Sequence, residues 1–443
     1  ILFIHNYLNK SLPICFENDF HKLENLYMLK SEISIPLSKI FNLSLMTGIY
    51  PDKLKISKTI PIFKKGDRHL TSNYRPISLL SNINKILEKI MFNRTYDFLD
   101  KHKCIYNLQF GFRKKYSTDH ALVKITETIR TALDNGKTAC GVFIDLQKAF
   151  DTVNHNILTD KLCHYGIRGT ANNWFKSYLS DRKQFVSFNG AESSKVTITH
   201  GVPQGSVLGP LLFLIYINDL HCAIRFSSVF ADDTNLLNIS NSIKRTQKQM
   251  NIDLNFLYKW LLANKISLNC SKTELIIFHK VRQKMNFKLK IKLNGHKLYP
   301  SDNIKYLGVY LDSTLSGEAH CKVLATKLRR ANGLLSKVRH YVPKKELKSL
   351  YHELFASHLT YGLQVWGQEK NLDMITKIQN RALRILNFRD FHADSSPLFR
   401  NENLLKLTYI LKIKNILFIH NYLNKSLPIC FENDFHKLEN IYT

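Results

Sequence analysis

Acidic side chains are scarce in this sequence of 443 residues. Asp and Glu number 35 against 64 Lys and Arg, which leaves a formal net charge of +29 and a pI of about 9.7. The basic excess is spread along the chain rather than confined to a tail. Such a charge is typical of proteins that bind a polyanion, with nucleic acid as the leading candidate. A basic surface that is simply solvated is the alternative.

Paired cysteines and long apolar runs are also missing. The eight Cys residues include no C-x-x-C pair and no zinc-finger spacing, so the pattern does not favour a zinc site. We expect reduced, mostly buried thiols in an intracellular protein. The longest apolar run, Val207 to Ile217, is too short to span a bilayer, so we expect no membrane partner. Residues 1–4 lack the basic start of a signal peptide.

One segment of the sequence occurs twice. Residues 1–25 are identical to residues 416–440. Structural repeats diverge with time, so perfect identity indicates a recent copying event or a join between tandem copies. The second copy continues a helical pattern that precedes it, and we expect it to be the native one. We expect residues 1–27 to be a passenger with little structural role, and the start at Ile1 rather than Met indicates a fragment.

Two adjacent carboxylates stand between apolar runs in SSVFADDTNLLN, residues 227–238. The pattern predicts a tight β-hairpin with Asp232 and Asp233 at its tip. Two ionised carboxylates about 4 Å apart repel by about 4 kcal/mol at an effective dielectric of about 20, and a hard cation such as Mg²⁺ relieves that repulsion. Asp145, at the end of a predicted buried strand over 139–146, is a candidate third carboxylate. A solvated turn and a strand-end cap are the alternatives.

Basic and glycine-containing turns precede predicted helices. Lys58 to Asp67 predicts a strand that runs into a basic turn, and Arg75 stands just before a helix predicted over about 82–100. Such cations suit phosphate, Arg through two parallel hydrogen bonds and Lys as a point charge, whereas a solvated loop is the alternative. GVPQGSVLGP, residues 201–210, predicts a rigid turn before an apolar helix. It is not a Walker loop, because no G-K-[ST] follows.

Aromatic and basic residues alternate in CIYNLQFGFRKKYST, residues 104–118. The mixture suits base stacking together with backbone contacts to a nucleic-acid strand, although the aromatics are equally suited to a core. For Asp151 and His155 a helix-capping Asp and a structural His are favoured over acid and base roles. Further helices are predicted over about 31–47, 120–135 and 240–262, and the pattern is helical from about Gly317 onward.

Several phrases occur in a diagnostic order. FIDLQKAFD, GVPQGSVLGP, FADD and KYLGV follow one another, and they are preceded by IPIFKKGD, NYRPISLL and QFGFR. From about Ser31 onward the chain resembles the polymerase of non-long-terminal-repeat retrotransposons of the jockey-like (LINE-type) group. The resemblance implies an α+β right-hand polymerase fold, with fingers and a palm built on an antiparallel sheet over 31–315. A helical thumb and C-terminal extension are expected over 316–443.

The resemblance also implies roles for individual residues. Asp145 and Asp232 match the family's two main ligands for two Mg²⁺ ions, and Asp233 supports them. Lys272 matches, more loosely, a lysine proposed to protonate the leaving pyrophosphate. The remaining matches are substrate-binding positions: Lys64 (with Lys65 as a near alternative) and Arg75 for the triphosphate, Phe150 for exclusion of ribose, Gln204 and Gly205 for template and nucleotide, and Tyr306 to Gly308 for the primer end.

We therefore expect a reverse transcriptase, a nucleotidyltransferase that extends a DNA primer with dNTPs on an RNA template. The alternatives are a degraded RNA-binding remnant and a maturase-like RNA-binding protein. A polymerase that makes RNA is disfavoured by the bulk of Phe150. The family implies action in the nucleus or in a cytoplasmic ribonucleoprotein. The family's endonuclease and the segment that normally opens its polymerase do not occur in this sequence, so we do not expect self-contained target nicking.

Overall fold

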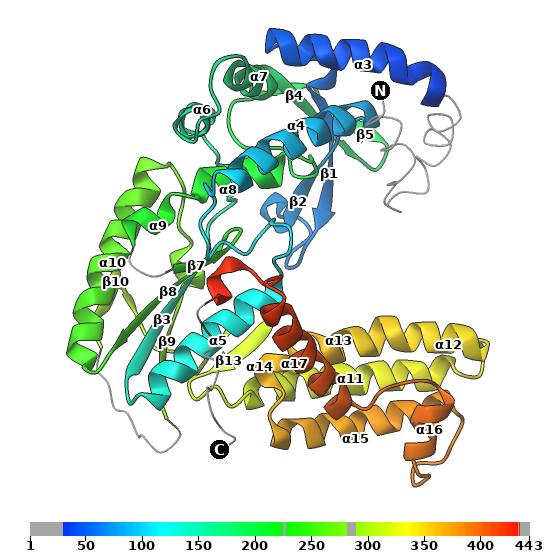
Figure 1. The fold of residues 1–443 in the computed structure, drawn as a ribbon. Helices are drawn as coiled ribbons and strands as arrows, with labels where there is room; N and C mark the ends of the chain where they lie inside the picture. Colours follow the sequence, from blue (N-terminus) through cyan, green and yellow to red (C-terminus); the bar gives the residue numbers. More distant parts are fainter. Residues whose placement is uncertain (1–29, 225–226, 281–288, 433, 435–443) are drawn as a thin grey trace. The chain divides into compact units, whose positions relative to one another are not determined.

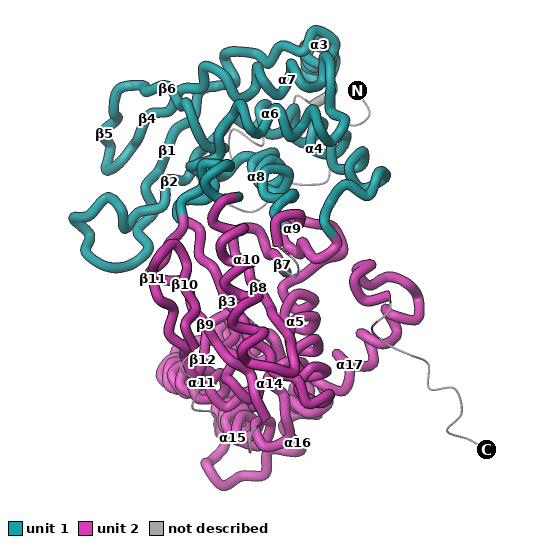
Figure 2. Tube along the Cα trace, turned by 90° about the vertical axis from the view of Figure 1, so that its left-hand side faces the viewer, with its two compact units in different colours: residues 1–106, 147–220, 260–267 teal, residues 107–146, 221–259, 268–443 magenta. Residues whose placement is uncertain are grey.

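The computed structural model describes residues 30–224, 227–280, 289–432 and 434. Helices are interspersed with strands that pair mainly antiparallel (Figure 1), so the expected α+β class is confirmed. The chain divides into two compact units, which interleave in sequence (Figure 2). Unit 1 consists of residues 1–106, 147–220 and 260–267, and unit 2 of residues 107–146, 221–259 and 268–443.

Unit 1 is built on a five-stranded sheet. The strands β2 (Tyr74–Leu79), β1 (Ile56–Phe63), β4 (Arg182–Phe188) and β5 (Ala191–Glu192) follow one another across it, and β6 (Val196–Ile198) also pairs with β4. β1 and β2 form an antiparallel hairpin in which Arg75 lies opposite Ile62. The predicted strand and basic turn are therefore confirmed, with Lys64 and Lys65 in the exposed turn that follows β1.

Two helices of unit 1, α3 (Lys30–Thr47) and α4 (Asn82–Lys101), begin and end within a residue of the predicted positions. Ser81 caps α4 by accepting a hydrogen bond from the Asn84 N–H, and Gly48 ends α3 in a left-handed conformation with φ of 72°. The apolar run after the glycine-containing turn forms a helix buried along almost its whole length. No helix in the described part of the chain is both long and apolar enough to cross a membrane. The helices are α3 (Lys30–Thr47), α4 (Asn82–Lys101), α6 (His155–His164), α7 (Gly169–Leu179), α8 (Gly209–Ile217) and α9 (Leu220–Ala223), the last at the junction with unit 2.

Unit 2 contains a four-stranded antiparallel sheet. Its order is β7 (Ser227–Phe230), β8 (Asp233–Ser240), β3 (Thr138–Ile144) and β9 (Glu274–Phe278). β3 lies in the interior of the sheet and six of its seven residues are buried, as expected for an apolar run. On one face, α5 (Thr118–Asp134) packs its apolar side against β3 and β9 in a shared core. On the other, Asn238 of β8 donates a 2.9 Å hydrogen bond to Asp253 of α10 (Ile243–Ala263).

Two small hairpins follow the sheet. The first is formed by β10 (Ile291–Leu293) and β11 (His296–Leu298), and the second by β12 (Asn303–Tyr306) and β13 (Val309–Asp312). The second is the hairpin predicted around KYLGV, and Leu307 and Gly308 form its turn with φ of 43° and 82°.

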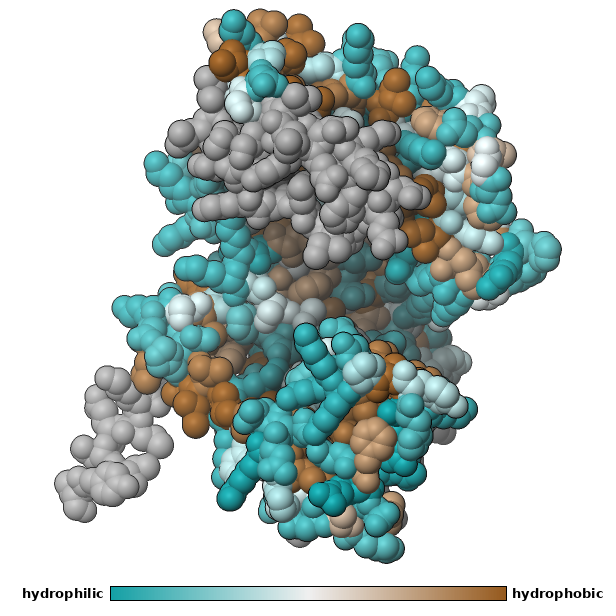
Figure 3. All heavy atoms as spheres, turned by 90° about the vertical axis from the view of Figure 1, so that its right-hand side faces the viewer, coloured by the Kyte–Doolittle hydropathy of each residue, from teal (hydrophilic) through white to brown (hydrophobic). Residues whose placement is uncertain are grey.

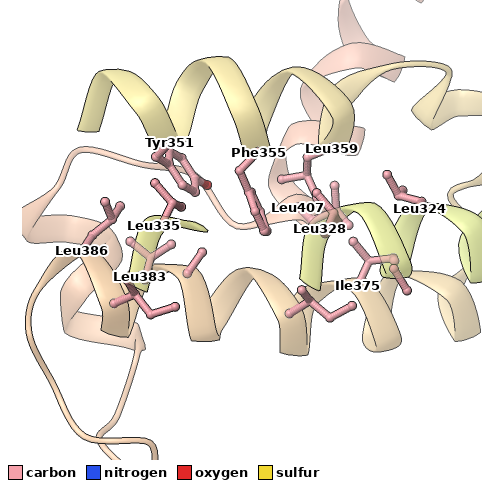
Figure 4. Packing of buried hydrophobic residues seen from close by; sticks show 14 of the residues in the cluster. Leu324, Leu328, Leu335, Tyr351, Phe355, Leu359, Ile375, Leu383, Leu386 and Leu407 are labelled. Carbon is pink, nitrogen blue, oxygen red and sulfur yellow. The ribbon is translucent and has the colours of Figure 1, made fainter. Parts of the chain in front are cut away.

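Helices form the remainder of unit 2, as the sequence predicts from Gly317 onward. The long α11 and α15 pack along each other. They are covered by Tyr351 of α12, Phe355 of the π-helical segment η5 (His352–Ala356) and Leu359 of α13 (Figure 4). Leu328, Leu335, Ile375 and Leu383 complete this core in Figure 4. The helices are α11 (Glu318–Val338), α12 (Lys344–Tyr351), α13 (Ser357–Thr360), α14 (Leu363–Trp366), α15 (Glu369–Leu386), α16 (Ser396–Asn401) and α17 (Leu407–Leu423).

The described part of the second copy, residues 416–432 and 434, is mostly exposed but packs on unit 2 through a few residues. Phe431 is only 2% exposed and packs edge-on against Phe418 and His120, with ring centroids 5.4 and 5.9 Å away. Lys124 of α5 donates to the Cys430 carbonyl at 2.8 Å and pairs with Asp434 at 2.6 Å. The expectation that residues 1–27 are a passenger concerns a segment that lies outside the described residues.

One expectation about the cysteines is wrong. Of the seven described free cysteines, only Cys140 and Cys321 are buried, whereas Cys163 and Cys222 are exposed. The reason is that α6 and α9 turn their exposed sides outward at those two positions. Most of the described cysteines are therefore not buried core residues.

The two copies of the duplicated segment offer a matched pair of substitutions. Phe431→Ala removes a buried ring, so we predict a loss of about 3–5 kcal/mol in the unfolding free energy of unit 2. Phe16→Ala changes the equivalent residue of the first copy, and we predict a change within about 0.5 kcal/mol. Urea unfolding of both full-length variants measures the difference. Equal destabilisation by the two substitutions would contradict the assignment of the first copy as a passenger.

Candidate active site

The acidic hairpin has the form that the sequence predicts. β7 and β8 pair antiparallel, Phe230 lies opposite Asp233, and Ala231 and Asp232 form the two-residue turn between them. Ala231 has φ of 57°, which is the left-handed geometry that such short hairpin turns require. Asp232 therefore lies at the tip of the hairpin, and Asp233 is the first residue of β8.

The register of the sheet brings the third carboxylate to the same end. Ile144, the last residue of β3, pairs with Thr234 of β8. The ladder ends at this pair, so Asp145, which follows Ile144, and Asp233, which precedes Thr234, lie at the same end of the sheet. Three aspartates that are separated by almost ninety positions in the sequence thus meet at one end of the unit 2 sheet.

The segment just before α5 contacts the β7–β8 hairpin and supports its turn. Gln109 pairs with Val229 of β7, and its side-chain oxygen accepts hydrogen bonds from the Gly111 N–H (2.8 Å) and the Ala231 N–H (3.2 Å). A Cβ atom on Gly111 would lie 2.4 Å from the Ala231 nitrogen, so only glycine fits there. Phe110 is buried in the core. QFGFR therefore belongs to unit 2 and supports the acidic turn.

The carboxylates act on one another electrostatically. Partial desolvation, followed by the charges of Asp232 and Asp145, raises the pKa of Asp233 to about 6, although the residue remains accessible to solvent. Asp145 has polar partners, since its Oδ2 accepts from Asn269 Nδ2 at 2.8 Å and lies 3.3 Å from Lys272 Nζ. The backbone N–H of Asn269 also donates to the Asp145 carbonyl at 3.0 Å. The structure thus brings Lys272 to the predicted carboxylates.

The carboxylates have the donor chemistry of a site for a hard cation. Within the described ranges, no group of three or more His, Cys, Asp and Glu side chains is arranged as a ready metal-binding cluster. Even so, Asp232 and Asp233 are adjacent, Asp145 is near enough to raise the pKa of Asp233, and a lysine ammonium already lies beside Asp145. Carboxylate oxygens are preferred ligands of Mg²⁺. These three aspartates are the residues that would hold it.

The predicted nucleotide-binding turn in unit 1 is fixed against β2. The Gln204 carbonyl accepts from the Ser78 N–H at 2.7 Å, and Gly205 has φ of 119°. A Cβ atom on Gly205 would lie 2.5 Å from the Ser78 carbonyl oxygen, which requires glycine at this position. Arg75 is on the same strand as Ser78, so the structure places Gln204, Gly205 and the β1–β2 hairpin in one assembly.

Phe150 is another residue of unit 1 that the sequence predicts to contact the nucleotide. The Phe150 ring is half-buried and stacks on Phe213 of α8, with centroids 4.6 Å apart. Asp151 does not cap α6 as expected, because Asn154 is its cap and the Asp151 carboxylate accepts from Gln204 Nε2 at 2.8 Å. His155 is structural as expected, since its Nε2 bonds to the Gly201 carbonyl.

A buried acid that the sequence analysis overlooked supports the same turn. Glu88 of α4 is fully buried and accepts from the Val207 N–H at 2.6 Å and the Tyr178 hydroxyl at 2.9 Å. Burial raises the pKa of Glu88, which the buried Arg182 opposes. A weak signal was present in the sequence, because Glu88 follows Leu87 and lies three residues before Met91 on the side of α4 that is buried.

The β12–β13 hairpin, which is expected to support the primer end, packs against β8. Tyr306 is buried, stacks edge-on against Phe143 and accepts a 3.0 Å hydrogen bond from Asn235 Nδ2. The Tyr361 hydroxyl donates to the Leu307 carbonyl at 2.6 Å, which fixes the turn. The structure therefore ties this hairpin to the strand that carries Asp233.

Comparisons with known proteins agree with the resemblance that the sequence motifs indicate. Residues 62–311 match the family described as reverse transcriptase (RNA-dependent DNA polymerase). The chain is 31% identical over 392 residues to a probable RNA-directed DNA polymerase from transposon BS of Drosophila melanogaster, covering 83% of this chain and 42% of that protein. It is 30% identical over 400 residues to the RNA-directed DNA polymerase from mobile element jockey of the same species, covering 84% and 42%. The chain thus spans less than half the length of these relatives, and the expected resemblance to jockey-like elements is confirmed.

Among solved structures, the chain is similar to a telomerase from Candida albicans in complex with a fragment of telomeric RNA. The identity is 13%, the match covers 88% of this chain and 66% of that one, and the TM-score is 0.42. The family assignment rests on the sequence match, which extends over more than half of the 443 residues and contains all three aspartates of the acidic site. This chain belongs to the reverse transcriptase family.

Proposed function

We propose that the chain is an RNA-directed DNA polymerase that extends a primer 3′-hydroxyl with deoxynucleotides. The observation that carries the proposal is the β3–β8 register, which brings Asp145 and Asp233 to the same end of the sheet beside the Asp232 turn. Three carboxylates at the end of a buried sheet repel one another, and a divalent cation that binds between them offsets this repulsion. The proposal assigns the palm to the unit 2 sheet and the thumb to the helices from residue 316.

In this proposal Asp145, Asp232 and Asp233 hold two Mg²⁺ ions. Mg²⁺, when bound, lowers the pKa of the primer hydroxyl and neutralises charge on the triphosphate and the leaving pyrophosphate. Lys272, 3.3 Å from Asp145 Oδ2, donates a proton to the departing pyrophosphate. Asn269 fixes the orientation of Asp145 through its 2.8 Å hydrogen bond. Protein groups thus position charge and supply a proton, as phosphoryl-transfer chemistry requires.

Unit 1 supplies the proposed contacts to the incoming nucleotide. Arg75, with Lys64 or Lys65 from the exposed turn after β1, binds the triphosphate. Gln204 and Gly205 contact template and nucleotide, and the glycine allows close approach because the turn is already fixed against β2. Phe150, held by its stack on Phe213, excludes the ribose 2′-hydroxyl.

The proposed partners are an RNA template, a DNA primer and dNTPs. The net charge of +29 favours such polyanions. The proposed place of action is inside the cell, in the nucleus or in a cytoplasmic ribonucleoprotein. A chain that binds RNA without polymerising, as a remnant or a maturase-like protein does, is the second candidate, and the first experiment below separates the two.

Primer extension tests the polymerase assignment. We predict Mg²⁺-dependent incorporation of dTTP on poly(rA)/oligo(dT), and a loss of about a hundredfold or more in Asp232→Asn, because the neutral side chain binds a cation poorly. Asp302→Asn removes an exposed carboxylate of unit 2 in the loop between β11 and β12 and should retain activity. Binding of the substrate by the wild-type chain without any incorporation would refute the polymerase and favour the RNA-binding protein.

Sugar selectivity tests the role of Phe150. We predict that Phe150→Ala incorporates ribonucleotides at least about tenfold more readily relative to deoxynucleotides, because the space beside the sugar is no longer filled. Phe150→Tyr keeps the ring and its stack on Phe213, so it should keep the selectivity. Steady-state kinetics with paired dNTP and rNTP substrates gives both ratios. An unchanged ratio in Phe150→Ala would show that another residue excludes ribose.

A further inference from the structure

The outer face of α15 carries a row of basic side chains. The inner face of this helix packs Ile375, Ala382 and Leu383 into the helical core of unit 2. On the outer face, Asn380, Arg381 and Arg384 lie three, four and seven residues after Lys377, so all four share one side of the helix. Together with Arg329 of α11, Ile378 and Phe391, they line a pocket of about 370 Å³.

Positive charge in this pocket is not balanced by the chain. The lining contains four basic residues and no carboxylate. Among the described residues, Arg329, Lys377 and Arg381 form no ion pair with Asp or Glu. Arg384 is held in place by donating to the Ala393 carbonyl at 2.7 Å. Like charges in one concavity repel, so the arrangement favours an anionic ligand.

The pocket also has hydrogen-bonding and stacking groups. The side-chain oxygen of Asn380 is buried and has no hydrogen-bond partner in the described part of the chain. Phe391 is 63% exposed at the rim, and the Arg381 guanidinium lies over its ring at 5.8 Å. Nearby, Phe388 is 51% exposed beneath Arg339 at 5.3 Å. Exposed aromatic rings paired with arginines are typical of surfaces on which nucleobases stack.

We propose that this pocket, the α15 pocket, binds single-stranded nucleic acid. Arg329, Lys377 and Arg381 contact the phosphates, and one base stacks on Phe391 next to Asn380. In unit 2, α15 and α16 lie far from the β7–β8 hairpin (Figures 1 and 2), so the pocket is separate from the carboxylate site. Figure 3 shows that the helical end of unit 2 is mostly hydrophilic with scattered apolar groups, as a surface for a charged strand requires. The inference does not depend on polymerase activity.

Strand binding by matched charge variants tests the proposal. Lys377→Ala/Arg381→Ala removes two pocket cations, and Lys345→Ala/Arg400→Ala removes one Lys and one Arg that are exposed on α12 and α16. Fluorescence anisotropy of the full chain with labelled oligo(U) or oligo(dT) of about twelve nucleotides gives the affinities. For the pocket pair we expect at least about tenfold weaker binding, and the salt dependence should show about one to two fewer counterions released on binding. For the control pair we expect binding to weaken by less than about twofold.

Phe391→Ala tests stacking separately from charge. We expect about fivefold or more weaker binding of both oligonucleotides, with the salt dependence unchanged. Cross-linking of a 4-thiouridine oligonucleotide to the wild-type chain should label the segment around Phe391. Thermal melts confirm that each variant is folded. Equal effects of the two charge pairs, or no effect of either, would overturn the proposal. Full displacement of the strand by inorganic phosphate together with an inert Phe391→Ala would also overturn it, because the pocket would then hold only a small anion.

Discussion

The antiparallel register between β3 and β8 is the constraint on which the acidic site depends. A shift of one residue would turn every side chain of β8 to the other face of the sheet and separate Asp145 from Asp233. The buried apolar residues of β3 resist that shift, because Ala139 and Phe143 pack with Leu237 of β8 in the core below α5. Hydrophobic packing in the sheet therefore fixes the position of charge at its end.

The charges at the sheet end are held by groups whose own positions are fixed. Gln109 binds the Ala231 N–H from one side, and the packing of Gly111 against the same turn leaves no room for a larger residue. Asn269 and Lys272 approach Asp145 from the segment before β9. In unit 1, the turn at Gly205 is likewise fixed by its neighbours. Gly205 packs against the Ser78 carbonyl of β2, and Glu88 accepts a hydrogen bond from the Val207 N–H.

Much of this was predictable from the sequence. Alternation and turn residues predicted the Asp232–Asp233 hairpin, and the apolar run 139–144 predicted a buried strand that ends beside Asp145. What local patterns cannot give is pairing between distant segments. The contact of QFGFR with the acidic turn, the hydrogen bond from Gln204 to Asp151 and the burial of Glu88 each join residues that lie more than fifty positions apart. The exposed thiols of Cys163 and Cys222 depend on which side of a helix meets the core, and this too is set by tertiary packing.

The most direct test of the account measures the unfolding free energy of the protein as a function of pH, in the absence of divalent metal. The pKa of Asp233 rises from its usual 3.8 to about 6 on folding, so the folded state loses stability as the pH rises through this interval. Urea unfolding of wild type, Asp233→Asn and the exposed control Asp302→Asn in a chelator measures the effect. The account predicts that Asp233→Asn is more stable than wild type above about pH 6, that the gain disappears towards pH 4, and that Mg²⁺ stabilises wild type more than Asp233→Asn. Equal stability of Asp233→Asn and wild type at pH 7, with no response to Mg²⁺, would contradict it.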